Sequence, residues 1–99
     1  IPWPGVAPGA TMRRGREIGM QQTIHVDIRI DEDETNTLVY AELNLRGDHF
    51  EAIGRAKRNP HDRPIPVVGE ELATARALGN LALQVMEAAQ DKIERFLEE

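Results

Sequence analysis

Residues 37–57, TLVYAELNLRGDHFEAIGRAK, contain a complete predicted β-hairpin. In each half, apolar or small residues alternate with polar ones, and this period of two is typical of a strand with one buried face. The halves meet at Arg46-Gly47-Asp48, where glycine accepts the positive φ that tight hairpin turns require. We therefore expect strands over residues 37–46 and 49–57, joined by a tight turn.

The inner faces of these two strands differ in side-chain size. The first strand would turn inward Val39, Ala41, Leu43 and Leu45. In the second strand, Phe50 is followed on the same face by Ala52, Gly54 and Ala56. Small residues in a row on one face predict that another element of the chain packs closely over them.

One strand precedes the hairpin and one helix follows it. Apolar residues alternate with polar ones over 24–30 and predict the first strand, and the polar residues 31–36 form its turn. Residues 59–66 contain three prolines and are expected to be irregular. Gly69 as N-cap predicts a helix over 70–97, and Gly79-Asn80 leaves open whether that helix bends. The apolar stripe of this helix is Ala75, Leu78, Ala82, Val85, Ala89, Ile93 and Phe96.

This order of elements predicts an α+β fold, in which a three-stranded antiparallel sheet packs on a long C-terminal helix (β-β-β-α). Residues 20–99 are expected to form this single domain. Residues 1–19 are rich in proline and glycine and are expected to be an arm, or a tail ahead of a natural start at Met12 or Met20.

The predicted helix is longer than the predicted strands. At 1.5 Å per residue it extends about 40 Å, whereas each strand extends about 25–30 Å. Ile93, Phe96 and Leu97 would then lie beyond the sheet, and a second subunit is the simplest cover for them. The sequence therefore predicts a homodimer.

Composition narrows the classes of function. The 99 residues are 40% hydrophobic and 29% charged with a net charge of −5, which is ordinary for a globular protein. The chain has neither cysteine nor serine, so disulfides, thiolate metal sites and the two commonest covalent nucleophiles are excluded. No apolar run is long enough to span a bilayer. We expect a cytoplasmic, non-enzymatic protein without a cofactor, a membrane contact or a small-molecule substrate.

A basic cluster is the best candidate for a binding site. It consists of Arg55, Lys57, Arg58 and Arg63, and Arg29 and Arg46 would extend it. Two interpretations stay open, a phosphate-contacting surface and an ordinary solvated sheet face. No aromatic residue is expected beside the cluster, which predicts little preference for base sequence.

Metal binding is not expected from the sequence. His25, His49 and His61 match no compact ligand spacing. The acidic run 31–34 lacks the remaining ligands of a calcium loop and is expected to be a solvated turn.

A second set of residues is expected to hold the proline-rich loop against the start of the helix. Arg76 would reach the loop carbonyls or pair with Glu70 or Glu71, and Asp62 would pair with Arg63. The loop itself is expected to be ordered, because prolines lower the entropy of the unfolded chain. The residues in this structural set are Asn59, Pro60, Asp62, Pro66, Gly69 and Arg76.

Residues 54–78, GRAKRNPHDRPIPVVGEELATARAL, resemble a family of small actinobacterial proteins of unknown function, some associated with hypoxia and dormancy. The match extends over about residues 23–86. The resemblance implies a fold like that of double-stranded-RNA-binding domains, dimer formation and a shape comparable to ribosome hibernation factors. It implies no catalytic residue.

The start of the helix departs from that implied fold. True double-stranded-RNA-binding domains place lysines at the N-terminus of the last helix, where they contact phosphates. This chain has Glu70 and Glu71 there, which repel phosphate. The leading hypothesis is a stress-related dimer associated with the ribosome or structured RNA, and the alternative is a protein–protein interaction or regulatory module that binds no nucleic acid.

Overall fold

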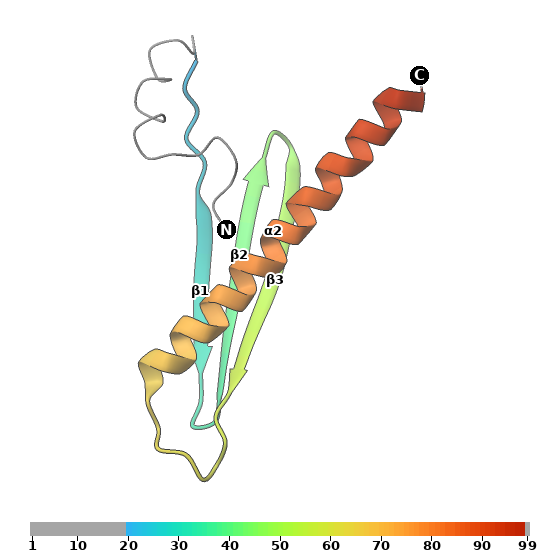
Figure 1. The fold of residues 1–99 in the computed structure, drawn as a ribbon. Helices are drawn as coiled ribbons and strands as arrows, with labels where there is room; N and C mark the ends of the chain where they lie inside the picture. The colour runs from blue at the N-terminus through green and yellow to red at the C-terminus, as the bar shows by residue number, and fades with distance from the viewer. Residues whose placement is uncertain (1–19, 99) are drawn as a thin grey trace, which may run out of the picture.

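The computed structural model describes residues 20–98, which form a three-stranded sheet and one long helix (Figure 1). The elements are β1 (Val26–Glu32), β2 (Asn36–Leu45), β3 (Asp48–Lys57) and α2 (Pro66–Glu98). The sheet is antiparallel with the order β1-β2-β3. The predicted α+β fold with β-β-β-α order is confirmed, whereas the relation to double-stranded-RNA-binding domains stays a prediction.

The predicted arm over residues 1–19 lies outside the described residues. Within residues 20–98, no helix has the apolar length that crossing a bilayer requires.

The hairpin turn has the predicted geometry. Leu45 pairs with Asp48, and the two residues between them, Arg46 and Gly47, have φ values of 48° and 87°. Two successive positive φ angles are those of a type I′ turn, whose twist matches that of the flanking strands. A two-residue turn also sets the register of the whole hairpin, so that residues whose numbers sum to 93 lie opposite each other.

The core lies between β2, β3 and α2, and it is small. Over the described part of the chain, residues 20–98, eight hydrophobic residues are buried, and five of them are alanines. The buried set is Val39, Ala41, Leu43, Ala52, Ala56, Ala73, Ala77 and Leu81. Small side chains let the helix backbone approach the sheet, as the sequence predicts. At Gly54 the approach is so close that an added Cβ would overlap the backbone of Ala73 and Ala77.

The helix begins four residues earlier than predicted. Pro66 is its first residue, because proline at that position loses no hydrogen bond and its φ already suits a helix. Gly69 is therefore in the first turn and is not an N-cap. A Cβ on Gly69 would lie 2.9 Å from Oγ1 of Thr37, so glycine lets this turn pack on β2. The helix continues without a break through Gly79.

Polar side chains of α2 cover the free edge of β3. Three of them, four residues apart, donate hydrogen bonds to three β3 carbonyls that are two residues apart. Four helical residues rise about 6.0 Å and two strand residues about 6.6 Å, so the two spacings match. The bonds run from Arg76 to Arg55 (2.7 Å), from Asn80 to Ile53 (2.8 Å) and from Gln84 to Glu51 (2.6 Å).

These bonds satisfy backbone groups that would otherwise offer an edge for pairing with another strand. They also correct the expectation for Arg76, which bonds a strand carbonyl and forms no ion pair with Glu70 or Glu71.

Candidate functional site

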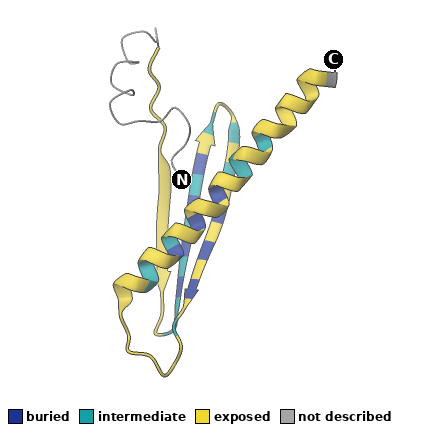
Figure 2. Cartoon of the chain, in the orientation of Figure 1, coloured by how far each residue is buried: buried dark blue, intermediate teal, exposed yellow. Residues whose placement is uncertain are grey.

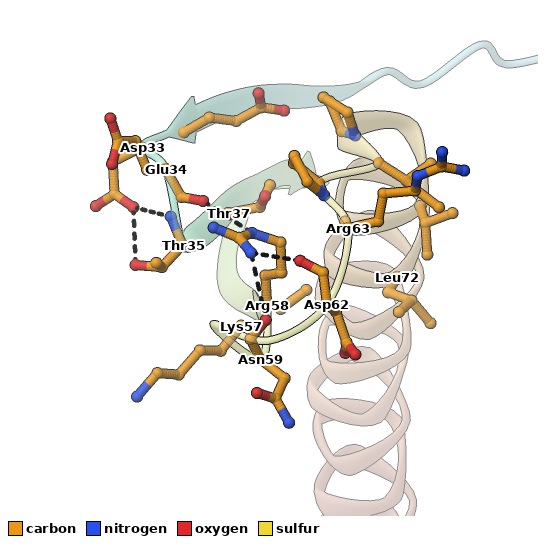
Figure 3. A pocket seen from close by; sticks show the side chains of 17 residues that line it. Asp33, Glu34, Thr35, Thr37, Lys57, Arg58, Asn59, Asp62, Arg63 and Leu72 are labelled. Carbon is orange, nitrogen blue, oxygen red and sulfur yellow. Dashed lines mark hydrogen bonds between the residues drawn. The ribbon is translucent and has the colours of Figure 1, made fainter.

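The loop between β3 and α2 is organised around the side chain of Arg58 (Figure 3). Its guanidinium donates to the carbonyl oxygens of Asp62 at 2.7 Å and Glu34 at 3.2 Å, with longer contacts to those of Asn59 and Pro60. Arg58 therefore ties the β1–β2 turn to the proline-rich loop.

Backbone bonds complete this loop. The N–H of Arg58 donates to the carbonyl of Thr35 at 2.7 Å, and that of Asp62 donates to the carbonyl of Asn59 at 2.9 Å. The side chain of Asn59 accepts from the N–H of His61 at 3.1 Å. Asp62 acts here through its backbone, and its carboxylate forms no ion pair with Arg63.

We predict that Arg58→Lys loosens this loop and lowers the free energy of unfolding by about 1 kcal/mol. A lysine carries its donors on one atom and cannot reach the carbonyls of Glu34 and Asp62 together. Amide hydrogen exchange between residues 59 and 65 should become faster, whereas Arg63→Lys should leave it unchanged. Equal exchange rates in wild type and Arg58→Lys would contradict this role.

A cavity of about 510 Å³ opens between this loop, the β1–β2 turn and the first turn of α2. Thr37, Arg58 and Arg63 are among its lining residues, together with Leu72 on the helix. The cavity wall is mixed in charge, because acidic residues of the β1–β2 turn face basic residues of the loop. No group of candidate metal ligands lines it among the described residues.

Two carboxyl groups near this cavity have shifted pKa values. Hydrogen bonding to the carboxyl group of Glu70 raises the pKa of Glu32, since the end of β1 lies beside the start of α2. The backbone N–H groups of Thr35 and Asn36 donate to Asp33 at 2.9 and 2.7 Å and lower its pKa. Asp33 therefore closes the turn as a carboxylate cap.

The outer face of the sheet, opposite the helix, is ordered into rows by the strand register. Arg29, Tyr40 and Ile53 form one row, and the Arg29 guanidinium lies over the Tyr40 ring at 4.5 Å. The row beside it contains Arg55, and Lys57 follows at the end of β3. On the other side of the Tyr40 row lies a row of three carboxylates, from Asp27, Glu42 and Glu51.

The structure does not bring the predicted basic residues into one patch. Arg55 and Lys57 share the outer face of β3, and Arg58 turns into the loop. Lys57, Arg58 and Arg63 are among the residues that line the cavity, whereas Arg55 is not. Arg46 lies at the opposite end of the sheet, where it donates to Gln22 Oε1 at 3.1 Å. The expectation that Arg46 extends the cluster is therefore wrong.

Tyr40 is the residue that sequence reasoning missed on this face. The expectation of no aromatic residue beside the cluster is wrong, because Tyr40 lies opposite Ile53, two residues from Arg55 on β3. The position of Tyr40 beside this cluster can be read from the two-residue turn at Arg46-Gly47, since the turn determines which residues of β2 and β3 lie opposite each other.

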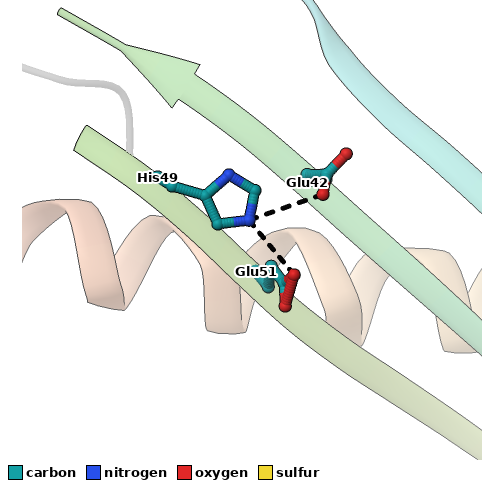
Figure 4. Close-up of side chains that lie close together, drawn as sticks. All are labelled: Glu42, His49 and Glu51. Carbon is teal, nitrogen blue, oxygen red and sulfur yellow. Dashed lines mark ion pairs between the residues drawn. The ribbon is translucent and has the colours of Figure 1, made fainter. Parts of the chain in front are cut away.

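The three histidines do not converge on one site. Among the described residues, the candidate ligand group contains His49 with Glu42 and Glu51 and includes neither His25 nor His61 (Figure 4). The carboxylates of Glu42 and Glu51 are thus the groups that join His49 in this candidate ligand group, and the spacing of the histidines in the sequence does not reveal them.

β1 is exposed along its length (Figure 2), and its inner face is apolar. Val26, Ile28 and Ile30 lie opposite buried residues of β2 and so face the helix side of the sheet. They nevertheless remain 40–43% exposed, because α2 packs on β2 and β3. At the far end of α2, Phe96 and Leu97 are 75% and 80% exposed, as the length argument predicts.

Comparisons with known proteins place this chain in a family. The family model described as Rv2632c-like matches residues 22–99. The uncharacterized protein Mb1767 of Mycobacterium bovis is 41% identical over 69 residues, which cover 70% of this chain and 73% of that protein. The uncharacterized protein Rv2632c of Mycobacterium tuberculosis is 36% identical over 73 residues, which cover 74% of this chain and 78% of that protein.

A solved structure agrees with the fold. The crystal structure of Rv2632c superposes with a TM-score of 0.76 at 32% sequence identity, covering 81% of this chain and 95% of that one. The residues that the family model matches include the whole sheet and the helix. The chain therefore belongs to the Rv2632c-like family.

Proposed function

We propose that this protein is a non-enzymatic interaction module that acts in the cytoplasm as a homodimer. The observation that carries the proposal is the uncovered apolar face of β1. Three of its side chains, Val26, Ile28 and Ile30, face the helix side of the domain. Ile24 continues the same alternation ahead of the strand, and all four side chains are at least two-fifths exposed.

The balance of buried and exposed apolar groups supports a partner. Only three residues of the buried hydrophobic core, Val39, Leu43 and Leu81, are larger than alanine, whereas sixteen large hydrophobic side chains are exposed over residues 20–98. Full burial of a valine, leucine or isoleucine side chain contributes about 1.5–3 kcal/mol. Covering the exposed two-fifths of such a side chain with a partner therefore contributes about 0.6–1.2 kcal/mol of further burial free energy.

A second copy of the chain is the occupant that fits this face. A two-fold axis places the same patch of each copy against the other, so one apolar surface serves both partners. The side chains of α2 already cover the edge of β3, so among residues 20–98 β1 is the free edge of the sheet. The distal part of α2 extends beyond the sheet and adds Ile93, Phe96 and Leu97 to the surface that the copies can share.

Sedimentation velocity of the full chain over micromolar concentrations tests this proposal. We expect one species at twice the 11.1 kDa mass of the chain. A single species at the monomer mass throughout the series would overturn the proposal.

Binding of structured RNA, including that of the ribosome, is the second candidate function. The row of Arg29, Tyr40 and Ile53 beside Arg55 favours it, because basic and aromatic side chains on an open sheet are a common surface for RNA. The net charge of −5 and the start of α2 at Glu70 and Glu71 oppose it. The stress and dormancy role rests on the family resemblance, and induction of the protein under oxygen limitation would test it.

We predict that the double variant Arg55→Glu with Lys57→Glu loses binding to ribosomes or structured RNA if this candidate is correct. Three phosphate contacts on the outer face, through Arg29, Arg55 and Lys57, give a log–log salt slope of about −2 to −3. Co-sedimentation at two salt concentrations measures both effects, and Arg46→Glu at the far end of the sheet is the matched control. Equal association of wild type and double variant would leave the homodimeric module without an RNA role. We do not reverse Arg58, because its guanidinium holds the loop.

A further inference from the structure

Three side chains converge on the outer face of the sheet, one on β2 and the other two on β3 (Figure 4). Nε2 of His49 lies 3.1 Å from Oε1 of Glu51 and 3.4 Å from Oε2 of Glu42. One potential ligand atom from each residue lies within 4.8 Å of the others. Ligand atoms on a tetrahedron with bonds of about 2.0 Å are about 3.3 Å apart, so the separations from Nε2 suit one small cation.

The imidazole of His49 is oriented by a fourth residue. Nδ1 of His49 lies 2.7 Å from Oδ1 of Asn44, the residue directly opposite on β2. The amide oxygen accepts a hydrogen bond, so Nδ1 carries the proton and donates it. The remaining ring nitrogen, Nε2, is thereby turned toward the two carboxylates. A hydrogen bond at one ring nitrogen that orients the other is the usual support of a metal-binding histidine.

The electrostatics of this surface favour a cation. Asp27, Glu42 and Glu51 lie in register across all three strands, and like charges directly opposite each other destabilise a sheet. The nearby basic side chains have other partners. Arg29 lies over Tyr40, Arg46 donates to Gln22, and Lys92 pairs with Asp48 at 2.6 Å.

We propose that Glu42, His49 and Glu51 form a binding site for a divalent transition-metal cation such as Zn²⁺. One imidazole nitrogen with two carboxylate oxygens suits a borderline cation, whereas Mg²⁺ and Ca²⁺ prefer oxygen ligands alone. The side chains of His49 and Glu42 are 43% and 46% exposed, so the cation reaches the site from solvent and keeps a coordination position open. The site joins β2 to β3 on the face opposite the helix and does not depend on the proposed dimer.

Calorimetric titration of the full chain with Zn²⁺ tests the proposal. We expect one Zn²⁺ per chain, bound more tightly than Mg²⁺. His49→Ala should abolish this binding, and Asn44→Ala should weaken it by about tenfold or more, because the imidazole loses its orienting partner. His61→Ala, which removes an imidazole at the other end of the sheet, is the matched control and should bind like wild type.

Long-range ¹H–¹⁵N correlation spectra of the histidine side chains identify the ligand atom. Addition of Zn²⁺ should shift the Nε2 resonance of His49 and leave both ring nitrogens of His61 unchanged. The proposal fails if His49→Ala binds Zn²⁺ as wild type does, or if His61 shifts and His49 does not. The double variant Glu42→Gln with Glu51→Gln keeps the imidazole of His49 and should also lose Zn²⁺ binding. Circular dichroism verifies that each variant is folded.

Discussion

Gly54→Ala should lower the free energy of unfolding by about 3 kcal/mol, at the upper end of what overpacking costs. A Cβ at this position would overlap the carbonyl oxygen of Ala73 and the backbone nitrogen of Ala77. These are backbone atoms, so no rotamer change can make room and α2 must move away from β3. The movement would open the core and stretch the hydrogen bonds from the helix to the edge of β3.

The measurement is urea unfolding followed by circular dichroism, at one fixed protein concentration because dimer formation couples stability to concentration. Gly79→Ala is the matched control. A Cβ on Gly79 meets nothing within 4 Å, and alanine is favoured over glycine inside a helix by about 1 kcal/mol, so this variant should be more stable than wild type. Unchanged stability of Gly54→Ala would show that the helix does not approach the sheet this closely.

Ile28→Glu should convert the proposed dimer into monomers. Ile28 lies in the middle of the uncovered face of β1, opposite Ala41, and a carboxylate there would be buried against the second copy without a partner. A change of about 2 kcal/mol in association free energy raises the dissociation constant about thirtyfold. Sedimentation velocity over a dilution series measures that shift.

Ile53→Glu is the control for this prediction. Ile53 is exposed, as Ile28 is (52% and 40%), but it lies on the outer face of the sheet in the row of Tyr40. This variant should remain a dimer. If Ile53→Glu dissociates and Ile28→Glu does not, the two copies meet through the outer face and the proposed arrangement is wrong.

Two features of the structure follow from the sequence by simple rules. The turn at Arg46-Gly47 determines the pairing of β2 with β3, so the proximity of His49 to Glu51 and Glu42 follows from counting outward from it. The start of α2 at Pro66 was likewise readable, since proline is frequent at the first position of a helix.

The role of Arg58 could not be predicted in this way. Its guanidinium is engaged because carbonyls from the β1–β2 turn and from the loop after β3 converge on it, and that convergence exists only in the folded chain. From sequence alone, Arg58 is equivalent to Arg55, whose side chain lies on the outer face of β3. Arg55 and Arg58 are close in sequence, but the backbone directs one side chain to the outer face of the sheet and the other into the loop.

Local patterns by themselves determined the three strands, the tight turn and the close approach of the helix, because alternation, a turn glycine and a row of small residues each act over a few neighbouring positions. The alternation in residues 24–30 also determined that β1 has an apolar face. Only the tertiary structure decided that this face stays uncovered. Gly54 and the hydrogen bonds to the edge of β3 hold α2 over β2 and β3, and one helix is too narrow to cover a third strand as well.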